Sequence, residues 1–342
     1  MSESILSVNN LKVSFKTRSG DVQAVRGVSY ELKRGEVMGI VGESGSGKSV
    51  SSMALMQLLG SNAIIKEGSA VFGGTDLLRL KTKEINKIRG SKISIIFQDP
   101  MTCLNPLMKV GEQVAETLRE HNPGVTKNEA LKRVIDLFAQ VRIPNPKNRF
   151  YSYPHEFSGG MRQRAMIAMA LACNPDIIIA DEPTTALDVT IQAQIVQILK
   201  NLQKDRNMSI IFITHDLGVV AEICTKIVVM YGGMILERGS AEEIYENPSH
   251  PYTLGLMAAV PRLDQNRDKP LDPIPGSPPD MLAPPAGCPF CPRCPYARLI
   301  CNYEMPPEYV IGNNHTSCCF MHDKDAPEEN NPFYKSVKEG GA

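Results

Sequence analysis

The stretch GESGSGKS, residues 42–49, is the strongest local signal in the sequence. It matches the pattern G-x-x-x-x-G-K-[ST], in which glycines let backbone N–H groups turn inward around phosphate oxygens. Residues 35–42, GEVMGIVG, predict a short buried strand, and residues 49–60, SVSSMALMQLLG, predict a helix that closes at Gly60. A glycine-rich loop between a strand and a helix indicates a P-loop nucleotide-binding site.

The loop residues have distinct expected roles. Lys48 is expected to contact the β- and γ-phosphates of ATP, and the Ser49 hydroxyl to ligate Mg²⁺. The helix N-terminus adds positive potential at the same point. The loop residues expected to bind ATP are Gly42, Glu43, Ser44, Gly45, Ser46, Gly47, Lys48 and Ser49.

A second motif, IIIADE at residues 177–182, supplies carboxylates. An apolar strand that ends in Asp-Glu places them at the carboxyl edge of the sheet, where the phosphate loop also lies. We expect Asp181 to hold Mg²⁺, directly or through water. Glu182 is then left to orient or deprotonate the attacking water, so the sequence predicts an ATPase.

A third motif, FSGGMRQ at residues 157–163, opens a predicted helix. Ser158 suits the N-cap, and a helix N-terminus attracts an anion. One phosphate loop already serves the nucleotide of this chain, so the second anion site is expected to serve a nucleotide held by another subunit.

The order of elements predicts an α/β protein. Residues 6–15 and 24–33 alternate apolar and polar side chains, as half-buried antiparallel strands do, and later strands alternate with helices, which indicates a mostly parallel sheet. We expect an ATPase domain at 1–260, with a helical subdomain at about 99–174. Eight of the 27 residues from Pro261 to Gly287 are proline, so 261–342 is predicted to be a linker, a small cysteine-rich module and a polar tail.

Composition limits the remaining classes of function. The 37 basic and 37 acidic side chains give a net charge of zero, whereas a nucleic-acid-binding protein usually carries a strongly basic face. The first residues, MSESILSVNN, carry no secretory signal pattern. No apolar run approaches the roughly 18 residues of a membrane-spanning helix.

Five motifs in order, GESGSGKS, FQDP, SGGMRQR, IIIADEPTTALD and ITHD, make the chain resemble the nucleotide-binding subunit of ATP-binding-cassette (ABC) transporters over about residues 5–255. The resemblance implies that Gln98 contacts Mg²⁺ and the attacking water, and that His215 contacts the γ-phosphate. It implies that Asp188 lies at a dimer interface and that Phe15 stacks on adenine.

The same resemblance implies that Ser158, Gly159 and Gly160 close over the γ-phosphate bound to the other subunit. The chain departs from the usual Leu-Ser-Gly-Gly-Gln pattern, because Phe157 and Met161 replace its two ends. Since the serine and both glycines are retained, closure over the phosphate is expected to be retained too.

Residues 246–261, the proline-rich stretch and the cysteines after it resemble the C-terminal extension of oligopeptide/dipeptide and nickel ABC import ATPases, most like the D-type subunit of dipeptide permeases. That implies a heterodimer with a second ATPase at the cytoplasmic face of the membrane, two permease subunits and an external peptide-binding protein. A nickel importer, and a soluble ABC ATPase of DNA repair or translation, stay as alternatives. Only 59 residues separate Gln98 from Ser158, too few for the long coiled coil that marks the soluble class.

Six of the nine cysteines fall in the last sixty residues. Spacing alone favours a C-x₂-C-x₂-C-x₆-C set, which suits an iron–sulfur cluster, with a four-thiolate zinc site as the alternative. The family pattern instead implies a [4Fe–4S] cluster, and whether Cys318, Cys319 or Cys291 completes the site stays open. The four ligands implied by the family are Cys288, Cys294, Cys301 and Cys319.

Overall fold

The computed structural model describes residues 3–185, 187–259 and 273–333. Residues 261–272 of the predicted linker and 334–342 of the predicted tail lie outside the described residues. The chain divides into two compact units. The first is mainly Arg79–Ile213, and the second combines Ile5–Glu31 and Met38–Leu78 with the chain from Thr214 onward.

Three parallel strands form the sheet of the first unit. Strand β7 (Ile177–Asp181) lies between β6 (Ile93–Ile96) and β8 (Ser209–Thr214). Both β7 and β8 are buried along their whole length, as expected for apolar strands covered on both faces. The parallel arrangement confirms the α/β prediction for this part of the chain.

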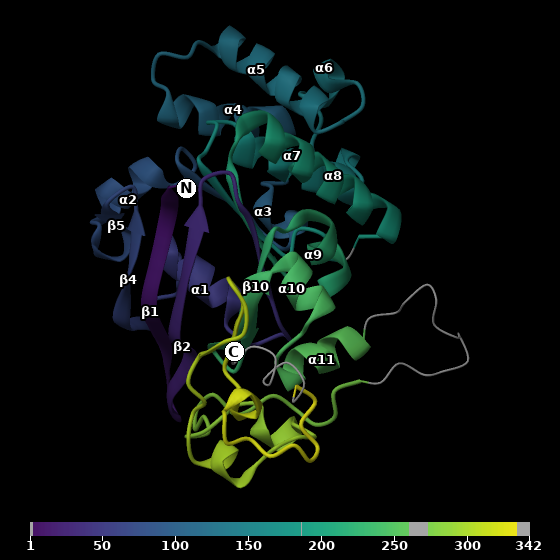
Figure 1. Cartoon of the computed structure of the whole chain (residues 1–342). Helices are drawn as coiled ribbons and strands as arrows, with labels where there is room; N and C mark the ends of the chain where they lie inside the picture. Colours follow the sequence, from purple (N-terminus) through teal and green to yellow (C-terminus); the bar gives the residue numbers. More distant parts are fainter. Residues whose placement is uncertain (1–2, 186, 260–272, 334–342) are drawn as a thin grey trace. The chain divides into compact units, whose positions relative to one another are not determined.

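Helices make up the rest of the first unit, and α4, α5 and α7 pack on one another (Figure 1). Thr126 caps α5 in a capping box with Glu129, which explains where that helix begins. The helices are α2 (Thr82–Ile88), α3 (Pro100–Cys103), α4 (Val110–His121), α5 (Lys127–Gln140), α6 (Pro146–Arg149), η2 (Pro154–Glu156), α7 (Gly159–Leu171) and α8 (Val189–Arg206).

The second unit contains a four-stranded sheet in the order β2-β1-β4-β5. Strands β1 and β4 are antiparallel, with Leu6 opposite Phe72 and Phe15 opposite Ala63. The alternating pattern at residues 6–15 and 24–33 therefore predicted β1 and β2 correctly, whereas β4 and β5 were not predicted. Their bounds are β1 (Ser4–Thr17), β2 (Gly20–Lys33), β4 (Ala63–Phe72) and β5 (Thr75–Asp76), followed by η1 (Leu77–Arg79).

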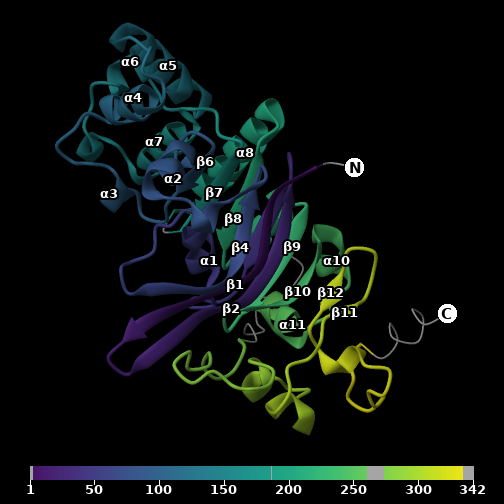
Figure 2. The same cartoon turned by 90° about the vertical axis from the view of Figure 1, so that its left-hand side faces the viewer.

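The second unit also contributes strands in the order β11-β12-β10-β9-β3. Strands β3 and β9 are parallel, whereas β9 and β10 form an antiparallel hairpin and β10 pairs with β12 near the C-terminal end (Figure 2). The strands are β3 (Val37–Val41), β9 (Lys226–Tyr231), β10 (Met234–Ser240), β11 (Tyr309–Val310) and β12 (Thr316–Ser317).

The helices of the second unit are short. Helix α1 begins at Lys48 but ends at Leu55, before the predicted stop at Gly60, because Gln57 takes a left-handed conformation (φ 50°) and its side chain donates to the Leu77 carbonyl. The others are α9 (Leu217–Ile223), α10 (Ala241–Glu246), α11 (Pro251–Ala258), η3 (Cys291–Arg293), η4 (Leu299–Asn302) and η5 (Phe320–His322).

Candidate functional site

The glycine-rich loop joins β3 to α1 in the second unit. Gly42 and Gly47 have φ values of 153° and 93°, which L side chains rarely adopt. A Cβ on Gly42 would lie 2.1 Å from the Met230 carbonyl oxygen, and one on Gly47 would lie 2.4 Å from that of Ala24. Both glycines are therefore required by the close approach of other backbone.

Lys48 is folded back onto this loop. Its side chain is buried, and its Nζ donates to the carbonyl oxygens of Gly42 (2.7 Å) and Glu43 (2.9 Å). Ser49 follows in the first turn of α1 and is half-buried. Ser46 Oγ is buried and finds no hydrogen-bond partner among the described residues. An unsatisfied buried hydroxyl inside a loop of inward backbone amides fits a site built for phosphate oxygens.

The carboxylate pair lies in the first unit, at the end of β7. Asp181 is buried, and Glu182 follows it in the left-handed region (φ 45°), which is uncommon for a residue other than glycine. Glu182 Oε2 accepts hydrogen bonds from Gln98 Nε2 and from Thr185 Oγ1, both at 2.9 Å. The structure thus brings Gln98 and Glu182 together. Thr185 was not identified from the sequence, although a hydroxyl three residues after Glu182 is close enough in the chain to suggest a hydrogen bond to it.

The SGG motif opens α7 as predicted, with Ser158 Oγ accepting from the Met161 N–H at 3.3 Å. A Cβ on Gly160 would lie 2.8 Å from Ile191 Cγ2, whereas one on Gly159 would meet nothing closer than 3.8 Å. Asp188 caps α8 by accepting from the Ile191 N–H at 2.9 Å. The first turns of α7 and α8 are therefore in contact through Ile191.

Phe157, which replaces the usual leucine, is buried, and the guanidinium of Arg149 lies 5.7 Å from its ring centre. The substitution is therefore accommodated in the apolar interior, and it leaves Ser158 exposed. Phe15 is half-buried near the end of β1, and His215 is exposed directly after β8; both belong to the second unit.

Five cysteines line one small cavity near the C-terminus, together with His250 and other residues. Burial raises the pKa of Cys288 to about 12 and that of Cys294 to about 11. Among the described residues, no group of three or more His, Cys, Asp or Glu side chains is arranged to hold a metal ion. The five cysteines are Cys288, Cys291, Cys294, Cys301 and Cys319.

The two cysteines whose role was open differ in the structure. Cys318 does not line the cavity; its N–H donates to the Leu236 carbonyl on β10. Cys291 does line it, and its thiol lies 3.4 Å from Asn302 Oδ1, to which it donates. The cavity lining therefore separates Cys319 from Cys318 but does not separate Cys319 from Cys291.

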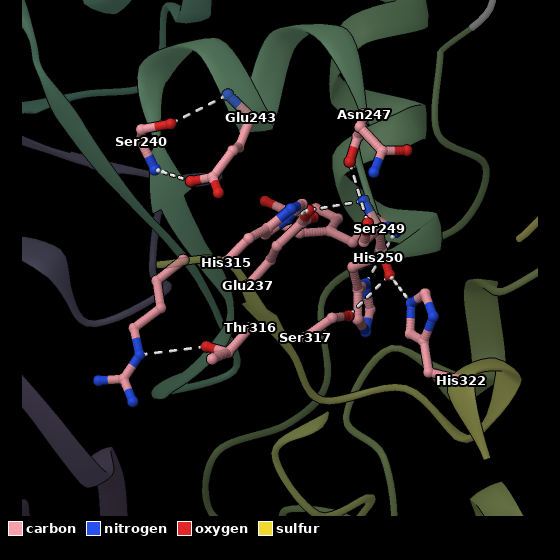
Figure 3. Close-up of polar contacts among 12 residues, drawn as sticks. Glu237, Ser240, Glu243, Asn247, Ser249, His250, His315, Thr316, Ser317 and His322 are labelled. Carbon is pink, nitrogen blue, oxygen red and sulfur yellow. Dashed lines mark hydrogen bonds and ion pairs between the residues drawn. The ribbon is translucent and has the colours of Figure 1, made fainter. Parts of the chain in front are cut away.

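A buried polar network attaches the C-terminal residues to β10 (Figure 3). His315 Nε2 lies 2.7 Å from Glu237 Oε1, and the same carboxylate oxygen accepts from the Ser249 N–H at 2.6 Å. Ser317 Oγ donates to the Ser249 carbonyl at 2.7 Å. Sequence reasoning missed this network, because its members are far apart in the chain and match no spacing motif.

His250 caps the start of α11, since its Nδ1 accepts from the Tyr252 N–H at 3.0 Å. Burial holds the pKa of His250 down at about 3, so the ring is neutral. The Tyr252 hydroxyl accepts from the Glu43 N–H at 2.8 Å. Residues around α11 therefore contact the phosphate loop, a role that the sequence did not reveal.

The loop geometry, the buried Lys48 and the Asp-Glu pair after a buried strand define a P-loop ATPase of the cassette type. The chain matches the family described as ABC transporter over residues 25–185, and the family described as Oligopeptide/dipeptide transporter, C-terminal region, over residues 236–301.

Curated relatives match nearly the whole chain. The dipeptide transport ATP-binding protein DppD of Bacillus subtilis is 52% identical over 325 residues, covering 95% of this chain and 96% of that protein. The oligopeptide transport ATP-binding protein OppD of Salmonella typhimurium is 52% identical over 316 residues, covering 92% and 93%. A solved dimeric cassette, MJ0796 in a post-hydrolysis state bound to ADP and Pi, superposes with a TM-score of 0.63 at 30% identity, covering 69% of this chain and 98% of that one. The chain belongs to the ATP-binding proteins of ABC transporters.

A search of the described helices finds none that is both long and apolar enough to cross a membrane.

Proposed function

We propose that this chain is the ATP-hydrolysing subunit of a transporter that imports dipeptides or oligopeptides. The observation that carries the proposal is the combination of a complete nucleotide-binding motif set with the C-terminal region of the peptide-transporter family. The named relatives that match more than nine-tenths of the chain are dipeptide and oligopeptide transport ATP-binding proteins.

The proposed chemistry is phosphoryl transfer to water. Lys48 and the loop amides bind the β- and γ-phosphates, and Ser49, Asp181 and Gln98 hold Mg²⁺. The transition state asks little covalent chemistry of the protein, so positioning and charge stabilisation supply most of the rate enhancement. Glu182 orients or deprotonates the attacking water, an assignment supported by its two hydrogen-bond donors.

The remaining motif residues are proposed to contact nucleotide, Ser158 that of the other subunit and His215 and Phe15 that of this chain. Ser158 is exposed at the N-terminus of α7, where it is available to a nucleotide bound elsewhere. His215 and Phe15 are assigned to the γ-phosphate and the adenine ring of the nucleotide that this chain binds. ATP binding closes two cassettes on each other and hydrolysis reopens them.

The assembly we propose is a heterodimer with a second, homologous ATPase. It docks at the cytoplasmic face of the membrane against two permease subunits, which receive peptide from an external binding protein. The domain boundaries proposed for this function are 1–260 for the cassette, with a helical subdomain at about 99–174, and 261–342 for the linker and cysteine-rich module.

The cysteine-rich module is proposed to hold a [4Fe–4S] cluster through Cys288, Cys294, Cys301 and Cys319. The proposal is supported by the shared cavity that these four thiols line. A cluster is wider than a zinc ion, whose four thiolates converge to about 2.3 Å from the metal. When bound, the cluster would cross-link four points of the C-terminal segment.

The cluster proposal is tested on anaerobically purified protein. Brown protein with visible absorption and with iron and sulfide in equal amounts is expected. Colourless protein that contains one zinc would contradict it.

The transport function is tested by co-expressing the chain with the second ATPase and both permeases. We expect the four subunits to co-purify, and ATP hydrolysis by the reconstituted complex to rise when a peptide-loaded binding protein is added. Hydrolysis that responds to DNA or ribosomes, with no association with permeases, would favour the soluble class instead.

A further inference from the structure

The proposed function does not account for one contact, which joins the C-terminal segment to the phosphate loop. Arg293 lies between Cys291 and Cys294 in the chain, and its guanidinium forms a bidentate ion pair with the distant Glu43. Nη1 lies 2.6 Å from Glu43 Oε2, and Nη2 lies 3.0 Å from Glu43 Oε1. Glu43 is the second residue of the phosphate loop, a position that the loop pattern leaves open to any residue type.

All three guanidinium nitrogens of Arg293 also donate hydrogen bonds to other groups. Its Nε donates to the Pro275 carbonyl at 2.8 Å, Nη2 donates to the Ile274 carbonyl at 3.1 Å, and Nη1 donates to the Tyr231 hydroxyl at 3.1 Å. The Arg293 side chain is only 5% exposed. A buried, planar, bidentate arginine is the geometry in which an ion pair fixes its partner most firmly.

Glu43 is held equally firmly from its own side. Its N–H donates to the Tyr252 hydroxyl, its carbonyl accepts from Lys48 Nζ at 2.9 Å, and its carboxylate pairs with Arg293. Every polar group of this residue is therefore bound. The loop conformation that presents backbone amides to phosphate is linked through Glu43 to the C-terminal segment.

The pair also has an electrostatic consequence. A carboxylate within a phosphate-binding loop repels the phosphates of ATP unless a cation neutralises it. Arg293 is the cation paired with Glu43. We propose that Arg293 is a positioning residue for ATP binding: it fixes the phosphate loop and masks the Glu43 charge, so that the folding of the cysteine-containing segment controls affinity for nucleotide. This inference does not require the cysteines to bind a cluster.

The test measures MgATP affinity of the full chain by calorimetry. Arg293→Met should weaken binding about tenfold, because the negative charge of Glu43 in the phosphate loop is then no longer neutralised. Adding Glu43→Gln to that variant should recover much of the loss, to within about threefold of the wild type. If Arg293 only holds the loop in shape, the double variant should bind MgATP no more tightly than Arg293→Met does.

A matched control is Arg238→Met. Arg238 Nη2 lies 2.6 Å from Glu308 Oε1, so this pair also joins the C-terminal segment to the rest of the second unit, but without contacting the phosphate loop. We expect Arg238→Met to bind MgATP within twofold of the wild type.

Arg293→Lys shows whether misfolding causes the loss seen in Arg293→Met, because it keeps the positive charge and loses only the planar, bidentate geometry. We expect it to weaken MgATP binding by about threefold, and Glu43→Gln to relieve that loss as well. Binding by Arg293→Met within twofold of the wild type, or a double variant no better than Arg293→Met, would overturn the proposal.

Discussion

Replacing Glu182 by glutamine is expected to stop ATP turnover while leaving nucleotide binding in place. Glu182 Oε2 accepts from Gln98 Nε2 and Thr185 Oγ1, each at 2.9 Å. The glutamine carbonyl can accept the same bonds, but an amide has no charge and cannot take up a proton. A positioned general base contributes about 10²–10⁴-fold, so turnover should fall by that factor, which equals roughly 3–5 kcal/mol of activation free energy.

The assay is steady-state phosphate release by the assembled transporter, paired with calorimetric MgATP binding by the full chain. We expect Glu182→Gln to bind MgATP within about threefold of the wild type, because the loop that binds the phosphates is unchanged. Thr185→Val is the matched control: it removes one hydrogen bond to Glu182 and keeps the carboxylate, so its loss should stay below about tenfold.

Two outcomes would refute the assignment. Turnover by Glu182→Gln above about a tenth of the wild-type rate would remove Glu182 as the group that handles the attacking water, since a general base contributes far more than that. A larger loss in Thr185→Val than in Glu182→Gln would show that the local hydrogen bonds matter more than the carboxylate.

Three further predictions concern the loop, the cysteines and the buried network. Gly47→Ala should lower MgATP affinity more than tenfold, because its Cβ would meet a carbonyl oxygen at 2.4 Å, whereas Gly73→Ala, with open space around it, should bind normally; equal affinities would contradict this. Cys319→Ser should lose the visible absorption of a cluster and Cys318→Ser should keep it; the reverse result would exchange their roles. His315→Leu should lower the free energy of unfolding by about 3–5 kcal/mol in urea titrations, because the buried Glu237 carboxylate loses its side-chain partner and keeps only the Ser249 N–H; a loss below about 1 kcal/mol would show that the network contributes little.

Short sequence patterns were sufficient to predict the features whose backbone conformation depends on neighbouring residues. The glycine spacing and flanking strand predicted the loop before Lys48, and Ser158 was correctly placed at a helix N-cap. The buried strand β7 was predicted from its apolar run alone. These features depend on residues within a few positions of each other, which a pattern can capture.

Features that depend on contacts between residues far apart in the chain were predicted wrongly or were not predicted. Helix α1 ends early because Gln57 bonds to Leu77, a tertiary interaction that overrides helical spacing. The Arg293–Glu43 pair spans 250 residues, and neither position shows a periodic signal. Spacing could not separate Cys319 from its neighbour, because only the fold determines which thiol lines the cavity.

Peptide import by this chain is tested by measuring uptake of a labelled dipeptide in cells that lack the chain and are complemented with it. Wild-type protein should restore ATP-dependent uptake, and Glu182→Gln, expressed at the same level and bound to the same permeases, should not. Restored uptake with Glu182→Gln would contradict the account, as would a wild-type protein that hydrolyses ATP in the complex yet leaves peptide uptake at the level of the deletion strain.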